Sequence, residues 1–370
     1  MAATMQNTVK SAPAADEPAA LKGRIVLSID AMGGDRGPAA VVAGLAKSAQ
    51  KNSKIGFIVH GPKAELEPLI AKRKLGDRCV IRDAEETVTM DAKPAWVMRH
   101  GRGTSMQSAL DSVRNGEADV CVSCGNTGAL MALAMLRLRK LDGVNRPAIA
   151  CLWPSRSPQG FNIMLDVGAD IRADQTDLLQ YALMGVSYAR AGLNVAHPRV
   201  GLLNVGTEEH KGRAELKVAH ELIESAANAS DFEFVGFVEG SDLPSSRVDV
   251  IVTDGFSGNI ALKTGEGTAT LIRELLREAF GHSFLSRMAA VLAMTSLRRL
   301  SKKIDPRRVN GGVFMGLNGT VIKSHGSADA TGVSAAVKLA FQLADSGFRK
   351  RVEARLATAS ATVQDQLNNE

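Results

Sequence analysis

The 370-residue chain contains few aromatic side chains, few cysteines and no long apolar run. Phe, Trp and Tyr make up 4% of the residues, so stacked aromatic platforms for single-stranded nucleic acid are not expected. Four cysteines at irregular spacing do not form the disulfide framework of a small secreted domain, which indicates a reducing cytosol. No stretch of about 20 apolar residues is present to cross a membrane. We therefore expect a cytoplasmic protein that binds no nucleic acid.

The ends of the chain differ in composition from its middle. Residues 1–22 are rich in Ala and Pro and lack the continuous apolar core of a signal peptide, so they predict a disordered tail. The remainder shows no linker, and 45% hydrophobic residues suffice for a full core. We predict one α/β unit over 23–350, including a basic helical segment over 271–308, and a C-terminal helix or tail over 351–370. The net charge of +6 favours an acidic partner such as phosphate, anionic lipid or an acidic protein.

Short apolar runs rich in Val, Ile and Leu alternate with amphipathic helical patterns along the chain. Strands are predicted at 24–31, 54–60, 78–84, 118–124, 147–153, 161–167, 199–205, 248–254 and 319–325. Helices are predicted at 38–51, 62–75, 105–115, 127–141, 174–193, 212–228, 257–280 and 328–346. This alternation indicates an α/β fold of three layers, in which two lobes share a mostly parallel sheet between helices. The runs 147–153 and 161–167 are joined without a helix and predict an antiparallel hairpin.

Five strand-to-helix joints are polar or rich in glycine, and they are the first candidates for a ligand site. Ligands of parallel sheets bind beyond the carboxyl ends of the strands, so we expect the joints to gather at one sheet edge. Helix N-termini at that edge offer unpaired N–H groups and the positive end of the helix dipole, which suit an anion such as phosphate. The joints are 30–35, 125–128, 204–208, 253–259 and 323–326.

The joint Gly125-Asn126-Thr127-Gly128 opens a predicted helix and allows two interpretations. Its backbone N–H groups could bind an anion, or Asn126 or Thr127 could simply cap the helix. The residues alone support the two interpretations equally.

Three other joints bring positive or titratable side chains. The joint Ser257-Gly258-Asn259 resembles the first, and Lys263 lies one helical turn further on the same face as Asn259. Lys211 and His210 follow the joint at 204–208, and His325 follows the last predicted strand.

Cys121 and Cys124 form a Cys-x-x-Cys pattern within one predicted strand. An offset of three residues places their side chains on opposite faces, so they cannot share a zinc ion or a disulfide. We interpret both as small buried hydrophobes. Phosphate-binding P-loop, dinucleotide and nucleophile-elbow motifs are absent or incomplete, so we expect no metal and no cofactor.

The segment 271–308 is strongly basic and has apolar residues at helical spacing, among them Leu285, Met288 and Leu292. This pattern is typical of a helix that contacts a membrane surface or an acidic protein. A dimer-interface helix with a solvated basic face fits equally well. The residues that we expect to contact the membrane or the acidic protein are Arg298, Arg299, Lys302 and Lys303.

The ordered set of joints resembles one family. The segments DAMGGDRGP, GNTGALM, RPAIACLWP, LDVGA, PRVGLLNVGTEEHKG, VDVIVTDGFSGNIALKTGEG and NGTVIKSHGSAD, between residues 24 and 346, are similar to those of the bacterial phosphate acyltransferase family PlsX. The resemblance implies transfer of a fatty acyl group from acyl carrier protein to inorganic phosphate, giving acyl phosphate for glycerophospholipid synthesis. It also implies a fold similar to isocitrate and isopropylmalate dehydrogenases and to phosphotransacetylase. Further implications are a homodimer, peripheral membrane association and a downstream membrane acyltransferase as partner.

The resemblance also gives the joints a chemical role. Phosphate is already an anionic nucleophile and needs positioning, whereas the oxyanion formed at the thioester carbon needs preorganised donors. We therefore predict that Asn126, Lys211, Asp254 and His325 are catalytic. The predicted substrate- and phosphate-binding residues are Gly125, Thr127, Gly128, Ser257, Gly258, Asn259 and Lys263. The family usually has a small residue such as Ala at position 124, which argues against Cys124 as a nucleophile.

Three other functions remain as alternatives. A phosphotransacetylase-like enzyme would use acyl-CoA instead of acyl carrier protein, although the basic surface favours the carrier protein. A non-catalytic membrane scaffold would act through the segment 271–308. A metal-dependent NAD dehydrogenase of related fold would need an aspartate cluster and a nucleotide site, and the sequence shows neither.

Overall fold

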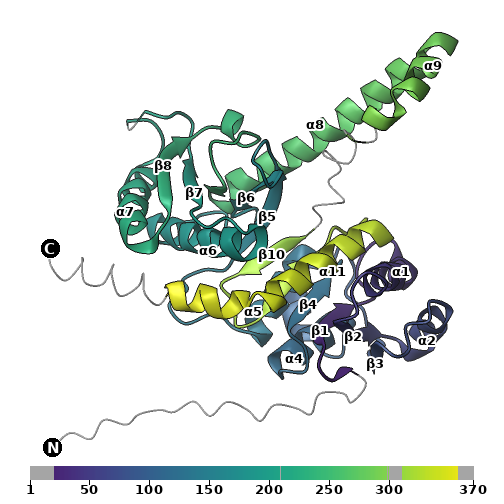
Figure 1. The fold of residues 1–370 in the computed structure, drawn as a ribbon. Coiled ribbons are helices and arrows are strands. Elements are labelled where there is room, and N and C mark those ends of the chain that lie inside the picture. The colour runs from purple at the N-terminus through teal and green to yellow at the C-terminus, as the bar shows by residue number, and fades with distance from the viewer. Residues whose placement is uncertain (1–20, 209, 298, 300–310, 357–370) are drawn as a thin grey trace, which may run out of the picture.

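A computed structural model describes residues 21–208, 210–297, 299 and 311–356 (Figure 1). Within these residues, eleven strands form one sheet in the order β3-β2-β1-β4-β11-β10-β5-β6-β9-β7-β8. The strands are β1 (Ile25–Asp30), β2 (Ile55–Gly61), β3 (Cys79–Asp83), β4 (Val120–Ser123), β5 (Ala148–Pro154), β6 (Phe161–Leu165), β7 (Arg199–Leu203), β8 (Glu233–Val238), β9 (Val250–Val252), β10 (Gly312–Met315) and β11 (Thr320–Lys323).

Helices connect most of these strands. They are α1 (Gly37–Ala49), α2 (Lys63–Lys72), α3 (Pro94–His100), α4 (Ser105–Arg114), α5 (Thr127–Arg137), α6 (Gln175–Leu193), α7 (Ala214–Ser230), α8 (Gly255–Gly281), α9 (Phe284–Leu292) and α11 (Ala330–Asp345). A short 3₁₀ turn spans Gly240–Asp242, and a last helix spans 348–356.

The sheet consists of two parallel blocks that run in opposite directions. Strands β1, β2, β3, β4 and β11 are parallel to one another, and so are β6, β7, β8 and β9. Between the blocks, β10 is antiparallel to β11 and β5, and β5 is antiparallel to β6. These reversals define a first lobe around β1–β4 and β11 and a second lobe around β6–β9 (Figure 1). The predicted hairpin of β5 and β6 is confirmed.

Helices cover both faces of the sheet, which confirms the predicted three-layer α/β fold. On one face, α1 packs on α11, α11 on α6 and α6 on α7. On the other face, α4 packs on β1, β2 and β4, and the start of α8 packs on β6. Each face has its own apolar core, and alternate residues of a strand enter different cores: Val120 and Val122 join the first, Cys121 the second. This is the period-two alternation of a strand that is buried on both sides.

All nine predicted strands are present, but β8 and β10 were not predicted. β10 has only four residues, GVFM, between glycines at 311 and 316, so it is too short for a periodic signal. Helix α3 has seven residues and was missed for the same reason. Short elements of this kind depend on contacts with distant residues, which local pattern does not show.

The ends of the folded unit differ slightly from the expected boundaries. Leu21, inside the predicted tail 1–22, is fully buried and packs with Val26 and Ile58. At the other end, the helix over 348–356 buries Phe348, Val352 and Leu356. Residues 1–20 and 357–370 lie outside the described residues.

Helices α8 and α9 form an arm that extends away from the second lobe (Figure 1). Of the 27 residues of α8, only Gly255 and Gly258 are buried, and α9 has no buried residue. The predicted helix 257–280 is therefore confirmed as part of α8. Arg299 is exposed and helical, whereas Arg298, Lys302 and Lys303 lie outside the described residues. None of the helices that the structure describes combines the length and apolarity needed to span a bilayer.

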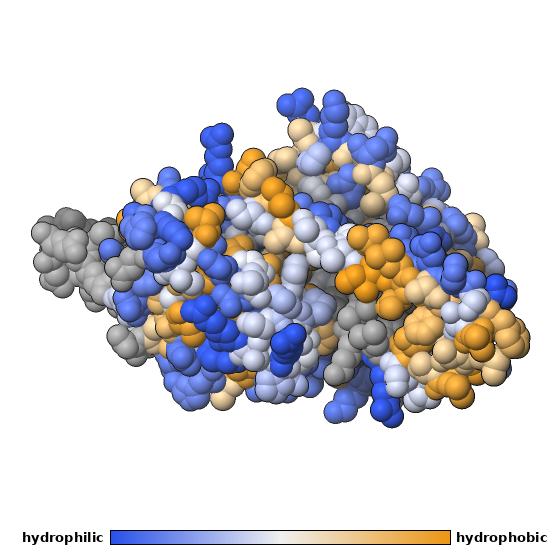
Figure 2. Space-filling model, turned by 90° about the horizontal axis from the view of Figure 1, so that it is seen from above, coloured by the Kyte–Doolittle hydropathy of each residue, from blue (hydrophilic) through white to orange (hydrophobic). Residues whose placement is uncertain are grey.

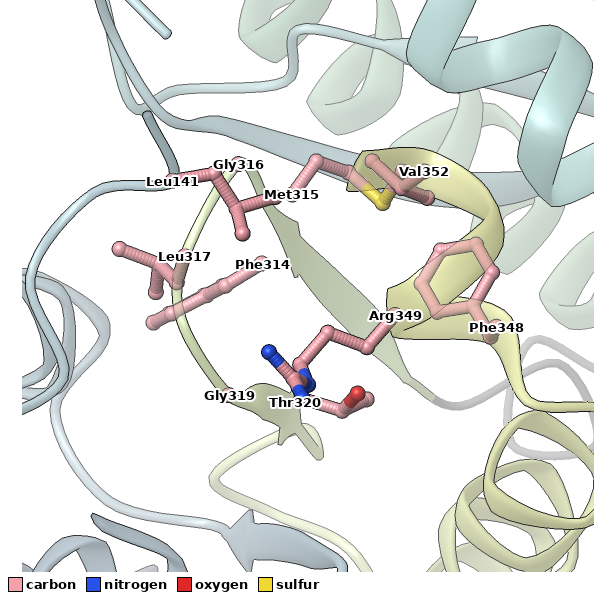
Figure 3. Close-up of a pocket in the computed structure, with 10 residues that line it drawn as sticks. All are labelled: Leu141, Phe314, Met315, Gly316, Leu317, Gly319, Thr320, Phe348, Arg349 and Val352. Atoms are coloured by element: carbon pink, nitrogen blue, oxygen red, sulfur yellow. The ribbon is translucent and has the colours of Figure 1, made fainter. Parts of the chain in front are cut away.

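A small pocket lies at the amino end of β11, between the β10–β11 turn and the last helix (Figure 3). Arg349 reaches from that helix toward Thr320, and Phe348 and Val352 close one side (Figure 3). Its volume of ≈ 10 Å³ is that of about one water molecule. The pocket is therefore too small for a substrate, and it lies at the other end of β11 from the candidate site described next.

Candidate active site

The five candidate joints lie in two groups at opposite edges of the sheet. Joints 30–35, 125–128 and 323–326 follow the parallel strands β1, β4 and β11 of the first lobe. Joints 204–208 and 253–259 follow β7 and β9, which run in the opposite direction. The expectation of one common edge is therefore wrong, because β10 and β5 reverse the strand direction between the lobes.

The first cluster is a row of polar side chains at the last positions of three neighbouring strands. Asp30 of β1 pairs in register with Ser123 of β4, and Ser123 pairs with Lys323 of β11. Residues that are cross-strand partners point to the same face of a sheet, which is here the face covered by α4. The carboxylate of Asp30 accepts hydrogen bonds from Ser123 Oγ at 2.6 Å and from Ser105 Oγ of α4 at 2.7 Å.

Burial strongly affects this carboxylate. Asp30 is only 2% exposed, and desolvation raises its pKa, although hydrogen bonds from Ser123 and Ser105 oppose the change. Its carboxylate is committed to hydrogen bonds within the protein, so Asp30 orients the ends of β4 and α4 around it.

The three loops of the first cluster approach one another so closely that side chains would not fit. A Cβ atom on Gly33 would lie 2.5 Å from the backbone nitrogen of Gly125. Gly34 has a φ of +98°, and its Cβ would lie 2.8 Å from the carbonyl oxygen of Gly326. The backbone N–H of Asp35 donates to that same oxygen at 2.8 Å. The glycines therefore serve this packing and hold the three strand ends together.

Asn126 caps helix α5 with its side chain. Its Oδ1 accepts the N–H of Ala129 at 3.0 Å, and its Nδ2 donates to the carbonyls of Met90 and Ala92 at 2.7 and 3.1 Å. All of these partners belong to the protein, so the capping interpretation holds for Asn126. The first N–H groups of a helix have no intrahelical acceptor. Those of the exposed residues Thr127 and Gly128 are the groups of this joint that are able to bind an anion.

Lys323 is a buried cation that sequence reasoning missed. Its side chain is 9% exposed, and its Nζ donates to the carbonyl oxygens of Cys124, at 3.3 Å, and Ser324. Desolvation lowers its pKa to about 8, against the opposing effects of Cys124 and Asp30. Lys323 ends the fully buried strand TVIK, and this burial is a property of the fold that the local sequence does not show.

His325 lies just beyond Lys323 and is exposed. Its Nδ1 accepts the backbone N–H of Ser327 at 3.2 Å and lies 2.9 Å from Ser327 Oγ. The imidazole is therefore oriented by its own loop and stands at the rim of the first cluster.

The second cluster, at the ends of β7 and β9, has exposed cations. Lys211 Nζ pairs with Glu208 at 2.7 Å, and the side chain is 43% exposed. Asn204, just after β7, donates from Nδ2 to the carbonyl of Lys211 at 3.2 Å. This hydrogen bond fixes the loop that carries Lys211. His210 is also exposed.

Asp254 is the N-cap of α8 and an ion-pair partner. Its Oδ1 accepts the N–H of Ser257 at 2.7 Å, and its Oδ2 accepts a hydrogen bond from Arg213. The side chain of Asp254 is 2% exposed, so this pair ties the β7–α7 loop to the start of α8. Because a carboxylate already occupies the N-terminus of α8, this helix end is not a free anion site like that of α5.

Gly258 and Asn259 pack against the end of β6. A Cβ on Gly258 would overlap the carbonyl oxygen of Asp166, and Asn259 Nδ2 donates to the carbonyl of Val167 at 3.0 Å. Gly258 is buried, so its predicted role in binding is not supported by its position. Asn259 is exposed and keeps its Oδ1 available to a ligand.

Lys263 is an exposed cation of α8. Helix α8 runs from the second cluster over β6 to Trp153 near the end of β5, where a Cβ on Gly265 would touch the indole ring at 2.5 Å. Lys263 pairs with Glu266 at 2.8 Å, and its charge makes a small contribution to the lowered pKa of Lys323.

Cys121 and Cys124 are free and buried, as predicted. They belong to the apolar cores of opposite faces, and Cys124 lies just beyond β4. Burial raises the pKa of both thiols, so neither is present as the reactive thiolate. Among the described residues, no group of three His, Cys, Asp or Glu side chains is arranged to hold a metal ion.

The fold belongs to the class seen in phosphotransacetylases. The EutD phosphotransacetylase from Staphylococcus aureus superimposes with a TM-score of 0.57 at 15% identity, covering 88% of this chain and 96% of that one. A phosphotransacetylase from Streptococcus pyogenes gives a TM-score of 0.58 at 15% identity, with 88% and 95% covered. At this identity the likeness concerns the fold alone.

Sequence comparison then identifies the family. The family model described as "Fatty acid synthesis protein" matches residues 25–351, and the chain belongs to this family, the PlsX phosphate acyltransferases. A phosphate acyltransferase of Paracoccus denitrificans is 70% identical over 369 residues, covering 100% of this chain and 98% of the relative. One of Jannaschia sp. is 71% identical over 349 residues, with 94% and 96% covered. The chain is thus an enzyme of the transferase class, as the resemblance implied.

Proposed function

We propose that the enzyme transfers a fatty acyl group from acyl carrier protein to inorganic phosphate and releases acyl phosphate for glycerophospholipid synthesis. The observation that carries this proposal is the buried ammonium of Lys323, which holds the carbonyl of Cys124 just before the exposed first residues of α5. A cation and unpaired helix N–H groups at one joint favour an anionic ligand. Phosphate and the oxyanion formed during acyl transfer both meet this requirement.

The reaction needs positioning and charge stabilisation more than proton transfer. A phosphate oxygen attacks the thioester carbon, a C–O bond forms, and the C–S bond breaks with its electron pair on sulfur. In this proposal the N–H groups of Thr127 and Gly128 hold phosphate or the oxyanion, and the exposed ammonium groups of Lys211 and Lys263 in the second lobe attract the incoming anion. His325, exposed at the rim, is the candidate donor of a proton to the leaving thiolate. Asp254 acts as a positioning residue through Arg213 and α8.

The α8–α9 arm is the proposed contact surface for partners. It exposes many large apolar side chains, and Figure 2 shows orange side chains gathered at the end of the molecule where the arm extends. Exposed apolar surface of this kind supports association with a second copy or with a bilayer surface. The residues are Leu271, Ile272, Leu275, Phe284, Leu285, Val291 and Leu292. A homodimer in the cytoplasm, held peripherally at the membrane near the next acyltransferase, fits this arm.

The proposed reaction can be tested directly with purified components. Palmitoyl-acyl carrier protein and phosphate are incubated with the enzyme, and acyl phosphate is trapped with hydroxylamine as the hydroxamate. We expect product that depends on both phosphate and enzyme. Absence of phosphate-dependent product would contradict the proposal. Equal or faster reaction with palmitoyl-CoA would instead favour the phosphotransacetylase alternative.

The scaffold alternative needs a test in cells. Lys211→Ala protein should fail to replace the wild-type enzyme, because a catalytic cation is lost. If Lys211→Ala and Asn126→Ala proteins both retained full cellular function with normal partner binding, a scaffold role would be favoured.

A further inference from the structure

Lys323 occupies an unusual place for a lysine. It is the last residue of β11, in the row formed with Ser123 and Asp30, and it points to the face covered by α4 and α8. Its ammonium donates to the carbonyls of Cys124 and Ser324. In the described part of the chain it forms a hydrogen bond with no carboxylate. A buried charge is costly unless something compensates it, so the position calls for a reason beyond folding.

The charged neighbours of Lys323 do not provide full compensation. Asp30 already accepts hydrogen bonds from Ser105 and Ser123, and Asp35 is exposed on the adjacent loop. Cys124 is a buried thiol with a raised pKa, so it carries no charge near neutral pH. From the other lobe, α8 presents a second cation, Lys263. The attraction of Asp30 and Asp35 for the Lys323 ammonium is therefore opposed by repulsion from Lys263.

A buried serine follows Lys323 in the chain. Ser324 is fully buried, and its side chain lies near the Cys124 thiol, in the apolar core of the face opposite to that of Lys323. Its carbonyl oxygen accepts a hydrogen bond from the Lys323 ammonium. Two backbone carbonyls therefore hold the ammonium in place, and neither of them neutralises its charge.

We propose that Lys323 is a positioning residue for a phosphate group bound at the N-terminus of α5. It acts in two ways: it anchors the Cys124 carbonyl, from which the 125–128 joint begins, and it places a positive charge beneath that joint. This inference rests on the proposed function and names the part of the site that binds the phosphate group. The phosphate group is either inorganic phosphate or the phosphodiester of the carrier protein's pantetheine arm.

The proposal predicts a particular pH dependence. Because burial lowers the pKa of Lys323 to about 8, its charge is lost as the pH rises through that value. We expect kcat/KM for the phosphate ligand to fall above pH 8, since this parameter reports ionisation of the free enzyme. Asp30, Asp35, Cys124 and Lys263 are the titratable groups facing Lys323, and the variants below separate its contribution from theirs.

Three variants test the proposal on the full-length enzyme. Lys323→Met keeps the length of the side chain without charge, and we expect KM for inorganic phosphate to rise about tenfold, with no fall in kcat/KM at alkaline pH. Lys323→Arg keeps the charge at all accessible pH values and should retain phosphate affinity while also abolishing the alkaline fall. Lys140→Met removes an exposed lysine that donates to the Asn145 carbonyl near the other end of β11, and it should change nothing.

The outcomes distinguish the possible ligands and the two proposals. A rise in KM for palmitoyl-acyl carrier protein instead of phosphate would assign the pantetheine phosphodiester. A wild-type enzyme without phosphate-dependent product at any pH would overturn the proposed function. An active wild-type enzyme whose kcat/KM is flat across pH 8, or an unchanged profile in Lys323→Met, would overturn the role of Lys323 alone. If Lys323→Met does not fold, Lys323→Arg supplies the test, because loss of the alkaline fall in that variant assigns the fall to position 323, and an unchanged fall would overturn the role of Lys323.

Discussion

The two clusters use the same residue types in different environments. In the first lobe, Asp30 and Lys323 are buried beneath closely packed glycine loops, and their partners are serines and backbone carbonyls. In the second lobe, Lys211 and Arg213 are exposed, and the acidic partner of Arg213, Asp254, is buried below it. Asp30 and Lys323 are held in fixed positions and have shifted pKa values, whereas exposed cations such as Lys211 can move toward a ligand.

This difference indicates that the two lobes contribute in different ways to binding a charged ligand. The first lobe provides a rigid, pre-oriented surface, which is what stabilisation of a developing charge requires. The second lobe provides exposed cations that can follow an incoming anion, namely Lys211 and, on α8, Lys263. Each prediction below changes one side of this comparison, and they follow in order of their expected effect on stability.

The largest effect is expected at the junction of β9 and α8 in the second lobe. A methyl group in Gly258→Ala would overlap the carbonyl oxygen of Asp166, so the helix start must move. We expect a loss of about 3 kcal/mol in the free energy of unfolding, measured in urea. The control is Gly267→Ala in the same helix, where no atom lies within 4 Å; it should stabilise by about 0.5–1 kcal/mol. Equal effects of the two changes would show that the junction is not tightly packed.

The second prediction concerns acid sensitivity of the first lobe. His60 is fully buried between Ser28 and Ser108, and desolvation, followed by the charge of Arg82, lowers its pKa to about 3. In the unfolded chain the imidazole binds a proton below about pH 6.5. Acidification therefore favours unfolding, by about 1.4 kcal/mol per pH unit below 6.5. At pH 5 this amounts to about 2 kcal/mol.

Replacement of the imidazole should remove this sensitivity. Between pH 7 and pH 5, the free energy of unfolding measured in urea should fall by about 2 kcal/mol less in His60→Gln than in the wild type. Ser108→Ala leaves the imidazole buried and should keep the acid effect. If His60→Gln is as acid-sensitive as the wild type, titratable groups other than His60 govern the pH response.

The third prediction tests the link between the loops of the second lobe. Asp254 and Arg213 should be coupled by about 1.5 kcal/mol in a double-mutant cycle of Asp254→Asn and Arg213→Gln. Asn at position 254 can still cap α8, so the cycle isolates the ion pair from the cap. A coupling near zero in urea unfolding would mean that the exposed Arg213 is held by other contacts.

The sequence predicted the α/β fold and most of its elements because the helices and the long strands each bury a periodic apolar face. It did not predict that β10 and β5 reverse the sheet, because strand direction depends on which distant strands pair. The division of the candidate joints into two groups follows from that reversal. Lys323 was missed because burial decides its role, and a lysine in a joint gives no local sign of burial. The sequence did not decide whether Asn126 caps α5 or binds an anion. Its contacts with Met90 and Ala92, which are distant in the chain, show that it acts as the cap.

The smallest effect on stability, and a large one on activity, is expected for Lys211 in the second cluster. Its ion pair with Glu208 is exposed, so Lys211→Gln should change the free energy of unfolding by less than about 0.5 kcal/mol. If the lysine moves from Glu208 to the substrate, kcat/KM for phosphate should fall about tenfold or more. The matched control is Glu208→Gln, which breaks the same ion pair but leaves the cation. We expect Glu208→Gln to retain or raise activity, because it releases Lys211 for the ligand. Equal losses in both variants would assign Lys211 to the loop rather than to the substrate.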